Sequence, residues 1–268
     1  MTASITPRST ASTASIPAAG FLPGFGALLR KELTEWRRAR RTWVVFLASV
    51  LFMALGAFNA WLISNLPADV TEGGELPSMD ALGNLLGPVS TYVFVIVAIF
   101  AVIALITAER ESGTLAWTAS KPVSRSGIWL AKFASATGIL WVAAAILPLA
   151  VTVAVVVVLY GSVPGTTIAA VAIGMGMVIA LYIAIALAAS TIVTSQAAVA
   201  GITLAVLAVA PMVAAFLPDP LLMPTSILDW SVRLGVGQPA GILPVIVWVL
   251  TVVGLTAFSL RRMERLDL

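Results

Sequence analysis

One polar stretch, residues 108–132, holds the side chains of this chain that are best suited to recognising another molecule. It begins with the alternating charges of residues 109–111, and the pair Gly113–Thr114 can end one helix and cap the next. The residue before Pro122 avoids the helical region, so the chain breaks there, and Ser124 can cap a helix that follows. The stretch is therefore suited to docking against a partner. An ordinary basic loop would have the same composition, and the residues alone fit both interpretations.

Side chains that perform catalysis are scarce. The chain has no histidine, the commonest general base and zinc ligand, and no cysteine for disulfide, iron–sulfur or thiolate chemistry. Several serines lie in or beside apolar stretches, but no histidine accompanies them and no lysine lies inside such a stretch. No acidic cluster lies near these stretches to hold a metal. We therefore expect no enzyme, no catalytic residue, no metal site and no cofactor in this chain.

Composition places the chain in a membrane. Of its 268 residues 60% are hydrophobic and only 10% are charged, whereas a soluble domain carries roughly 25% charged residues. The mean hydropathy is +1.06. The formal net charge of +3 comes from basic residues beside long apolar runs, which indicates membrane topology rather than binding to nucleic acid.

Six apolar stretches free of Asp, Glu, Lys and Arg are long enough to cross a bilayer, which takes about 20 residues in a helix. They run at about 43–64, 88–107, 133–160, 167–189, 197–217 and 241–260. Pro148 and Pro211 can bend the third and fifth of them. The sequence thus predicts an all-α polytopic membrane protein with six transmembrane helices in a domain over residues 43–260.

Basic residues gather in alternate connections, which predicts that both termini are cytoplasmic. The three basic groups precede span one, separate spans two and three, and follow span six: Arg30, Lys31, Arg37, Arg38, Arg40 and Arg41; Arg110, Lys121, Arg125 and Lys132; Arg261, Arg262 and Arg265. The connection after span one is acidic, and those after spans three and five hold only Arg233. Residues 261–268 are therefore expected to be a cytoplasmic C-terminus.

The N-terminal region divides into two parts. Residues 1–20 are rich in Ser, Thr and Ala and are expected to form a disordered cytoplasmic tail. Residues 21–42 form an amphipathic pattern, with Leu33 and Trp36 on the apolar face and Arg30 and Arg37 elsewhere. Such a helix is expected to lie at the membrane interface as an elbow, with its arginines near anionic lipid.

Smaller features carry their own predictions. Residues 224–234 are expected to form a short helix capped by Thr225 or Ser226. The small residues of 174–176 favour close helix packing. Isolated hydroxyl residues within the spans are expected mainly to bond to their own helix.

The run ERESGTL, then PVSR, then Lys132 before a long apolar helix, resembles the signature of the ABC-2 family of ABC transporter permeases. The six-span layout, the amphipathic elbow, the cytoplasmic termini and the polar segment between spans five and six are similar too. The resemblance covers nearly the whole chain after residue 20. The chain departs from a complete transporter because it contains no GxxxxGK phosphate loop.

The resemblance implies a permease dimer, of identical or different chains, bound to two separate ABC ATPase subunits that carry ATP and Mg. It implies a short coupling helix between spans two and three that docks on the ATPase. The matching residues are Glu109, Arg110, Glu111, Ser112, Gly113, Thr114 and Leu115 in the first motif, and Pro122, Val123, Ser124 and Arg125 in the second. The elbow residues Arg30, Lys31 and Glu32 are then expected to be secondary contacts with the ATPase.

The function expected from this resemblance is ATP-driven export across a bacterial inner membrane. The uncharged spans favour a hydrophobic or amphipathic cargo, but no substrate-binding residue can be assigned. An ion-coupled secondary carrier is the alternative, because backbone carbonyls of broken helices can bind sodium. An intramembrane enzyme is a more remote one.

Overall fold

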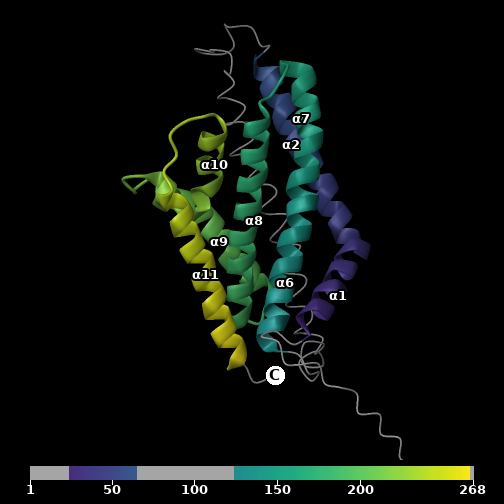
Figure 1. Ribbon diagram of the computed structural model, residues 1–268, viewed down its shortest axis with the longest axis vertical. Coiled ribbons are helices and arrows are strands. Elements are labelled where there is room, and N and C mark those ends of the chain that lie inside the picture. The colour runs from purple at the N-terminus through teal and green to yellow at the C-terminus, as the bar shows by residue number, and fades with distance from the viewer. Residues whose placement is uncertain (1–23, 65–123, 266–268) are drawn as a thin grey trace, which may run out of the picture.

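The computed structural model describes residues 24–64 and 124–265, and every regular element in these two ranges is a helix (Figure 1). The elements are α1 (Phe25–Arg38), α2 (Arg40–Ser64), α6 (Arg125–Leu140), the π-helical η1 (Trp141–Ile146), α7 (Leu147–Tyr160), α8 (Gly165–Ile192), α9 (Gln196–Ala214), the 3-10 turns η2 (Pro220–Leu222) and η3 (Pro224–Ser226), α10 (Ile227–Gly235) and α11 (Leu243–Glu264). The second expected span lies outside the described residues.

Five helical stretches in the described part are long and apolar enough to cross a membrane: Arg40–Phe58, Arg125–Val158, Gly165–Ile192, Gln196–Ala214 and Leu243–Glu264. They correspond to expected spans one, three, four, five and six, which confirms an all-α polytopic membrane protein. The helix that contains span three begins at Arg125, directly after its predicted N-cap Ser124 and about two turns before the apolar stretch that starts at 133. Lys132 therefore lies inside this helix and not in the loop before it.

Helix α8 lies at the centre of the bundle (Figure 1). Within the apolar 18-residue stretch of α8, 56% is buried inside the protein, whereas only 17% is buried in the corresponding stretch of α11, on the outside of the bundle. Two tryptophans from neighbouring helices donate indole N–H groups to its backbone: Trp141 to the carbonyl of Ala172 at 2.8 Å, and Trp248 to that of Met177 at 3.1 Å. Such bonds matter in a membrane because lipid offers an indole N–H no acceptor.

Two glycines of α8 let its neighbours approach closely, which confirms the packing predicted for residues 174–176. A Cβ at Gly176 would lie 2.7 Å from Nε1 of Trp141, and one at Gly174 would overlap the side chain of Ser231 on α10. Helix α10 with η3 matches the short helix predicted over 224–234. Ser226 is at its N-cap position but makes no side-chain capping bond in the described structure.

At Pro148, where the sequence allows a bend, the structure has a π-helical stretch, Trp141–Ile146, just before the proline. Proline lacks an N–H and its ring clashes with the carbonyl four residues earlier, and a wider turn relieves both constraints. Pro211 lies inside α9, which continues past it to Ala214.

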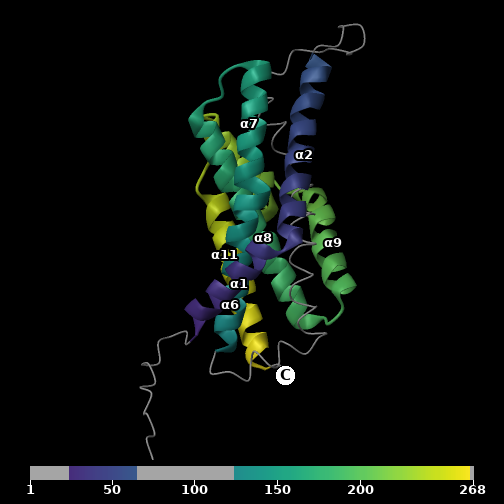
Figure 2. The ribbon, with the colours of Figure 1, turned by 90° about the vertical axis from the view of Figure 1, so that its right-hand side faces the viewer.

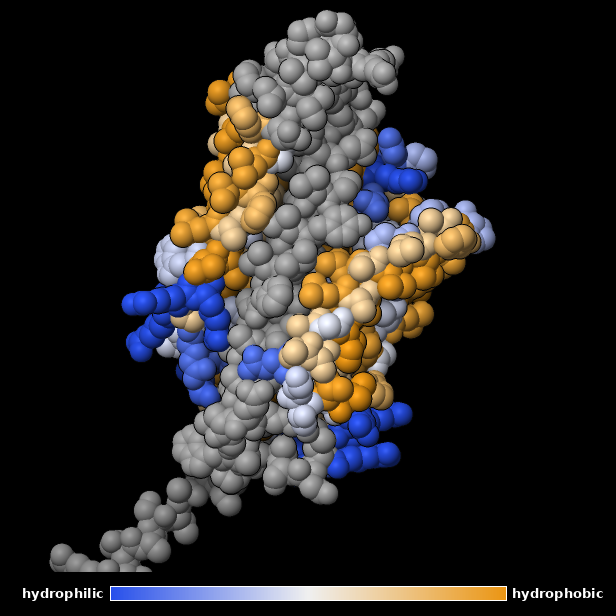
Figure 3. Space-filling view, turned by 180° about the vertical axis from the view of Figure 1, so that it is seen from behind, coloured by the Kyte–Doolittle hydropathy of each residue, from blue (hydrophilic) through white to orange (hydrophobic). Residues whose placement is uncertain are grey.

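The outer faces of the described spans are apolar, as lipid contact requires. Large exposed side chains include Trp43 and Leu47 on α2, Met212 on α9 and Leu250 on α11. Figure 3 shows this hydrophobic surface along the helices and hydrophilic clusters near their ends. Several hydroxyl groups within the spans bond to their own helix, as expected; Thr203, for example, donates to the carbonyl of Val199 at 2.8 Å. Thr167 instead donates to the carbonyl of Gly235 on α10, at 3.1 Å.

Apart from Arg233 on α10, the described elements place the basic residues near one end of the bundle, which we call the basic end. Helix α1, the start of α6, the α8–α9 link and the end of α11 lie toward it, while α2 and α7 reach the opposite end (Figures 1 and 2). The elbow helix and the last helix therefore share one side, as the charge pattern predicts.

Candidate functional site: a helix junction at the basic end

Helix α1 folds as the amphipathic elbow that its sequence predicts, from Phe25 to Arg38. Trp36 is fully buried and Leu33 is half-buried, while Arg30 and Lys31 are exposed. Lys31 forms an ion pair on the surface with Glu35, at 3.5 Å. The apolar face thus lies against the bundle and the basic face is open to a lipid headgroup or a protein.

A tight corner joins α1 to α2. Ala39 is extended (φ −73°, ψ 128°), so the helix ends and a new one begins at Arg40. The Thr42 hydroxyl donates to the Trp36 carbonyl at 2.6 Å, and the Arg41 guanidinium lies 4.9 Å from the centre of the Trp36 ring. A hydrogen bond and a cation–π contact therefore stabilise the turn from elbow to first span.

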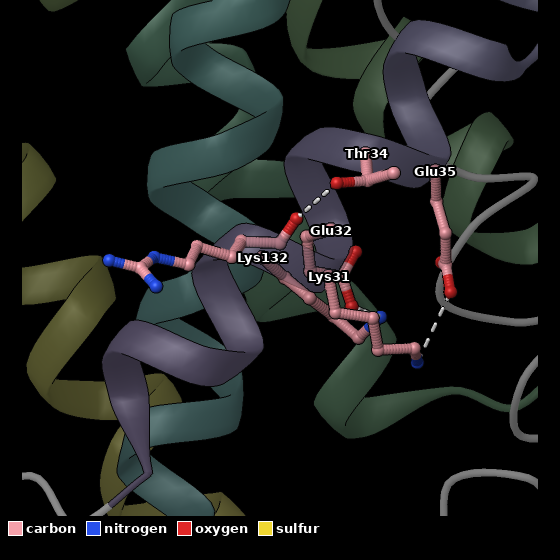
Figure 4. Close-up of polar contacts among 6 residues, drawn as sticks. Lys31, Glu32, Thr34, Glu35 and Lys132 are labelled. Carbon is pink, nitrogen blue, oxygen red and sulfur yellow. Dashed lines mark hydrogen bonds and ion pairs between the residues drawn. The ribbon is translucent and has the colours of Figure 1, made fainter.

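A buried ion pair joins α1 to α6. Nζ of Lys132 lies 3.1 Å from Oε1 of Glu32, and the two residues are 8% and 4% exposed (Figure 4). Trp36 on α1 and Trp129 on α6 belong to the same buried cluster. The ring of Trp129 stacks on that of Phe133, with 5.3 Å between the ring centres. The charges are thus held among aromatic and apolar side chains.

Of the three residues predicted as secondary contacts with the ATPase, Glu32 differs from Arg30 and Lys31 because its side chain is buried. Arg30 and Lys31 are exposed at the basic end, but Glu32 lies four residues before Trp36 on the buried face of α1. Its carboxylate therefore points inward to Lys132, because residues four apart share a helix face. Local sequence gives no signal for this pairing, since the two residues are 100 positions apart.

The last two residues of the second motif, Ser124 and Arg125, hold the start of α6 in place. Ser124 caps α6 itself, and Arg125 bonds α6 to α11. Ser124 is the N-cap that the sequence predicts, and its Oγ accepts from the Gly127 amide at 3.0 Å. Arg125 donates through Nη1 to the carbonyls of Met263 and Glu264, at 3.2 and 3.3 Å. These carbonyls end α11 and have no partner within the helix, so a guanidinium there also suits the helix dipole.

The rest of the expected coupling region lies outside the described residues: Glu109, Arg110, Glu111, Ser112, Gly113, Thr114, Leu115, Pro122 and Val123. Within the described part, no group of three or more His, Cys, Asp or Glu residues could hold a metal. The described residues form a junction in which α6 is bonded to both α1 and the end of α11.

The Ser124 cap has a measurable contribution. We expect Ser124→Ala to cost about 1 kcal/mol, which lowers the unfolding midpoint in detergent by about 2–4 °C for a chain of this size. Ser124→Asp restores an acceptor and should regain most of the loss in a thermal unfolding assay. Equal midpoints for the alanine and aspartate variants would contradict the capping role.

Apolar helices around a buried central helix define a polytopic membrane protein. The sequence model of one protein family, described as ABC-2 family transporter protein, matches residues 26–240. The chain belongs to this family. The match begins in α1 and extends through α10. No curated protein matches the sequence. Family membership points to a transport subunit rather than an enzyme.

Proposed function

We propose that this chain is the permease subunit of an ABC transporter that exports a hydrophobic or amphipathic compound. Two permease chains would form the pathway, and two separate ATPase subunits would hold ATP and Mg beneath it. The family match over residues 26–240 is the observation that carries this proposal. The sequence contributes no phosphate loop of its own, which is why we assign ATP hydrolysis to a partner.

The proposed cargo and orientation follow from charge. The described span centres are uncharged, which favours a substrate that needs no charged partner there. The basic end carries Arg30, Arg38, Arg125 and Arg261, so the positive-inside rule assigns it to the cytoplasm of a bacterial cell. Both termini would then be cytoplasmic, as would the ATPase.

The junction supports a route for force. Residues 109–125 lead directly into α6, whose first turn is fixed by Ser124 and whose Arg125 is bonded to the end of α11. A push on this segment would therefore enter spans three and six together. Exposed Arg30 and Lys31 on the neighbouring α1 remain proposed secondary contacts for the ATPase.

The coupling segment provides the test. Replacing Glu109, Arg110 and Glu111 with alanine is expected to leave membrane insertion intact while reducing compound-stimulated ATP turnover of the purified complex by about tenfold or more. The matched control replaces Asp69, Glu72 and Glu75, which lie in the acidic connection after span one. The stimulating compound would come from a screen of apolar compounds on the wild-type complex.

The proposal fails if the triple variant keeps wild-type ATPase binding and stimulated turnover. It also fails if purification of the chain from its native membrane recovers no nucleotide-hydrolysing subunit. A loss caused equally by the control substitutions would remove the special role of residues 109–111.

A further inference from the structure

Burying the Glu32–Lys132 ion pair costs free energy, because both charges lose contact with water. Both residues are buried, and charged groups taken out of water lose hydration that their mutual attraction does not fully return. The second carboxylate oxygen, Oε2 of Glu32, has no hydrogen-bond partner among the described residues. A pair with one oxygen unsatisfied contributes little to stability compared with an apolar pair of the same volume. Its value must therefore lie in geometry.

On α1 the contact with α6 combines one large apolar side chain with one charge, because Trp36 is fully buried in the same cluster as Trp129 and Glu32 lies one turn before it. A shift of α1 by one helical turn, about 5.4 Å, would place an apolar side chain, Trp36 or Leu28, where Glu32 now meets Lys132. Of the two carboxylates on α1, that of Glu32 is buried against Lys132, whereas that of Glu35 is exposed and paired with Lys31. Buried polar contacts that fix register between helices are the best-attested use of such pairs.

The position of the pair makes this register consequential. Helix α1 is joined to α2 by the tight corner at Ala39, and Lys132 lies two turns after Ser124, where the coupling segment ends. Helix α6 continues through η1 and α7 to the opposite end of the bundle. One ion pair thus connects the elbow to the helix that crosses the whole membrane.

We propose that Glu32 and Lys132 are positioning residues that fix the register of α1 along α6, so that the elbow and span three move as one body during transport. The role in transport rests on the proposed function, whereas the register of α1 along α6 is a property of this chain alone. In this role Glu32 acts through α6.

The register is tested on the purified chain. Because the chain has no native cysteine, Thr34→Cys and Ala134→Cys, both at exposed positions on α1 and α6, give a unique pair of spin-label sites. We expect a single narrow distance distribution in the otherwise wild-type chain, in Lys132→Arg and in the charge swap Glu32→Lys with Lys132→Glu. The apolar pair Glu32→Leu with Lys132→Met should fold but give a distribution broadened or shifted by up to about 5.4 Å, one helical turn.

Coupling is tested on the complex with its ATPase. A fluorophore on Val158→Cys, which is 84% exposed near the far end of α7, reports ATP-dependent movement. The apolar pair should reduce the ATP-dependent signal by about fivefold or more, whereas Lys132→Arg should retain most of it. A purely structural role would leave the signal of the folded apolar pair unchanged.

The outcomes separate the two proposals. A narrow, unshifted distribution and a normal ATP signal in the apolar pair overturn the register role and leave the proposed function standing. A broad distribution in both Lys132→Arg and the charge swap also overturns it. An absent ATP signal in the wild-type complex contradicts the transport role, while the spin-label result still decides the register.

Discussion

Replacing Lys132 with methionine is expected to lower the free energy of unfolding by about 3–5 kcal/mol. The substitution keeps most of the side-chain volume but leaves the Glu32 carboxylate buried with neither oxygen bonded to lysine. Removing one partner of a buried pair costs more than the pair contributes, because the remaining charge has lost both water and its counter-ion. Thermal or denaturant unfolding of the purified chain in detergent measures the loss.

Two controls make this result specific. Arg30→Met removes a basic residue from the exposed face of α1 and should change stability by less than about 0.5 kcal/mol. Glu32→Leu combined with Lys132→Met removes both charges and should regain most of the stability that Lys132→Met loses. If the single and double variants are equally unstable, the loss comes from packing around position 132 and not from the orphaned carboxylate.

Local patterns in the sequence were enough to predict where helices begin and which of their faces are buried. The spacing of Leu33 and Trp36 predicts the buried face of α1, and Ser124 predicts the start of α6. The small residues at Gly174 and Gly176 predict close packing on α8. Each of these signals lies within one or two turns of the feature that it predicts, because helix geometry repeats on that scale.

Contacts between distant segments were not predictable in the same way. Glu32 has the same local context as Arg30 and Lys31, and only the packing of α1 on α6 turns its carboxylate inward. Arg125 was recognised as a motif residue, but its bonds to the end of α11 cross 138 positions. Hydropathy could indicate that α10 is a short helix, but not that it lies against the glycines of α8. Periodicity specifies which face is buried and leaves the partner unspecified.

Adding a methyl group to α8 at either glycine is expected to destabilise the protein by about 1–3 kcal/mol. At Gly176 the new Cβ would meet the Trp141 ring, whose indole N–H is bonded to the Ala172 carbonyl and is not free to move aside. At Gly174 it would meet Ser231 and Leu228, two buried side chains of α10. Unfolding midpoints of Gly174→Ala and Gly176→Ala measure the two losses.

The helices offer matched controls for this effect. A Cβ at Gly201 in α9 or at Gly254 in α11 meets nothing within 4 Å, so alanine there should stabilise the chain by about 0.5–1 kcal/mol through helix propensity. Ser231→Ala should recover part of the loss in Gly174→Ala and none of that in Gly176→Ala, because it removes only the hydroxyl that faces Gly174. Equal recovery in both would mean that Ser231 acts on α8 as a whole. With recovery confined to Gly174→Ala, the clash at position 174 is assigned to the Ser231 hydroxyl.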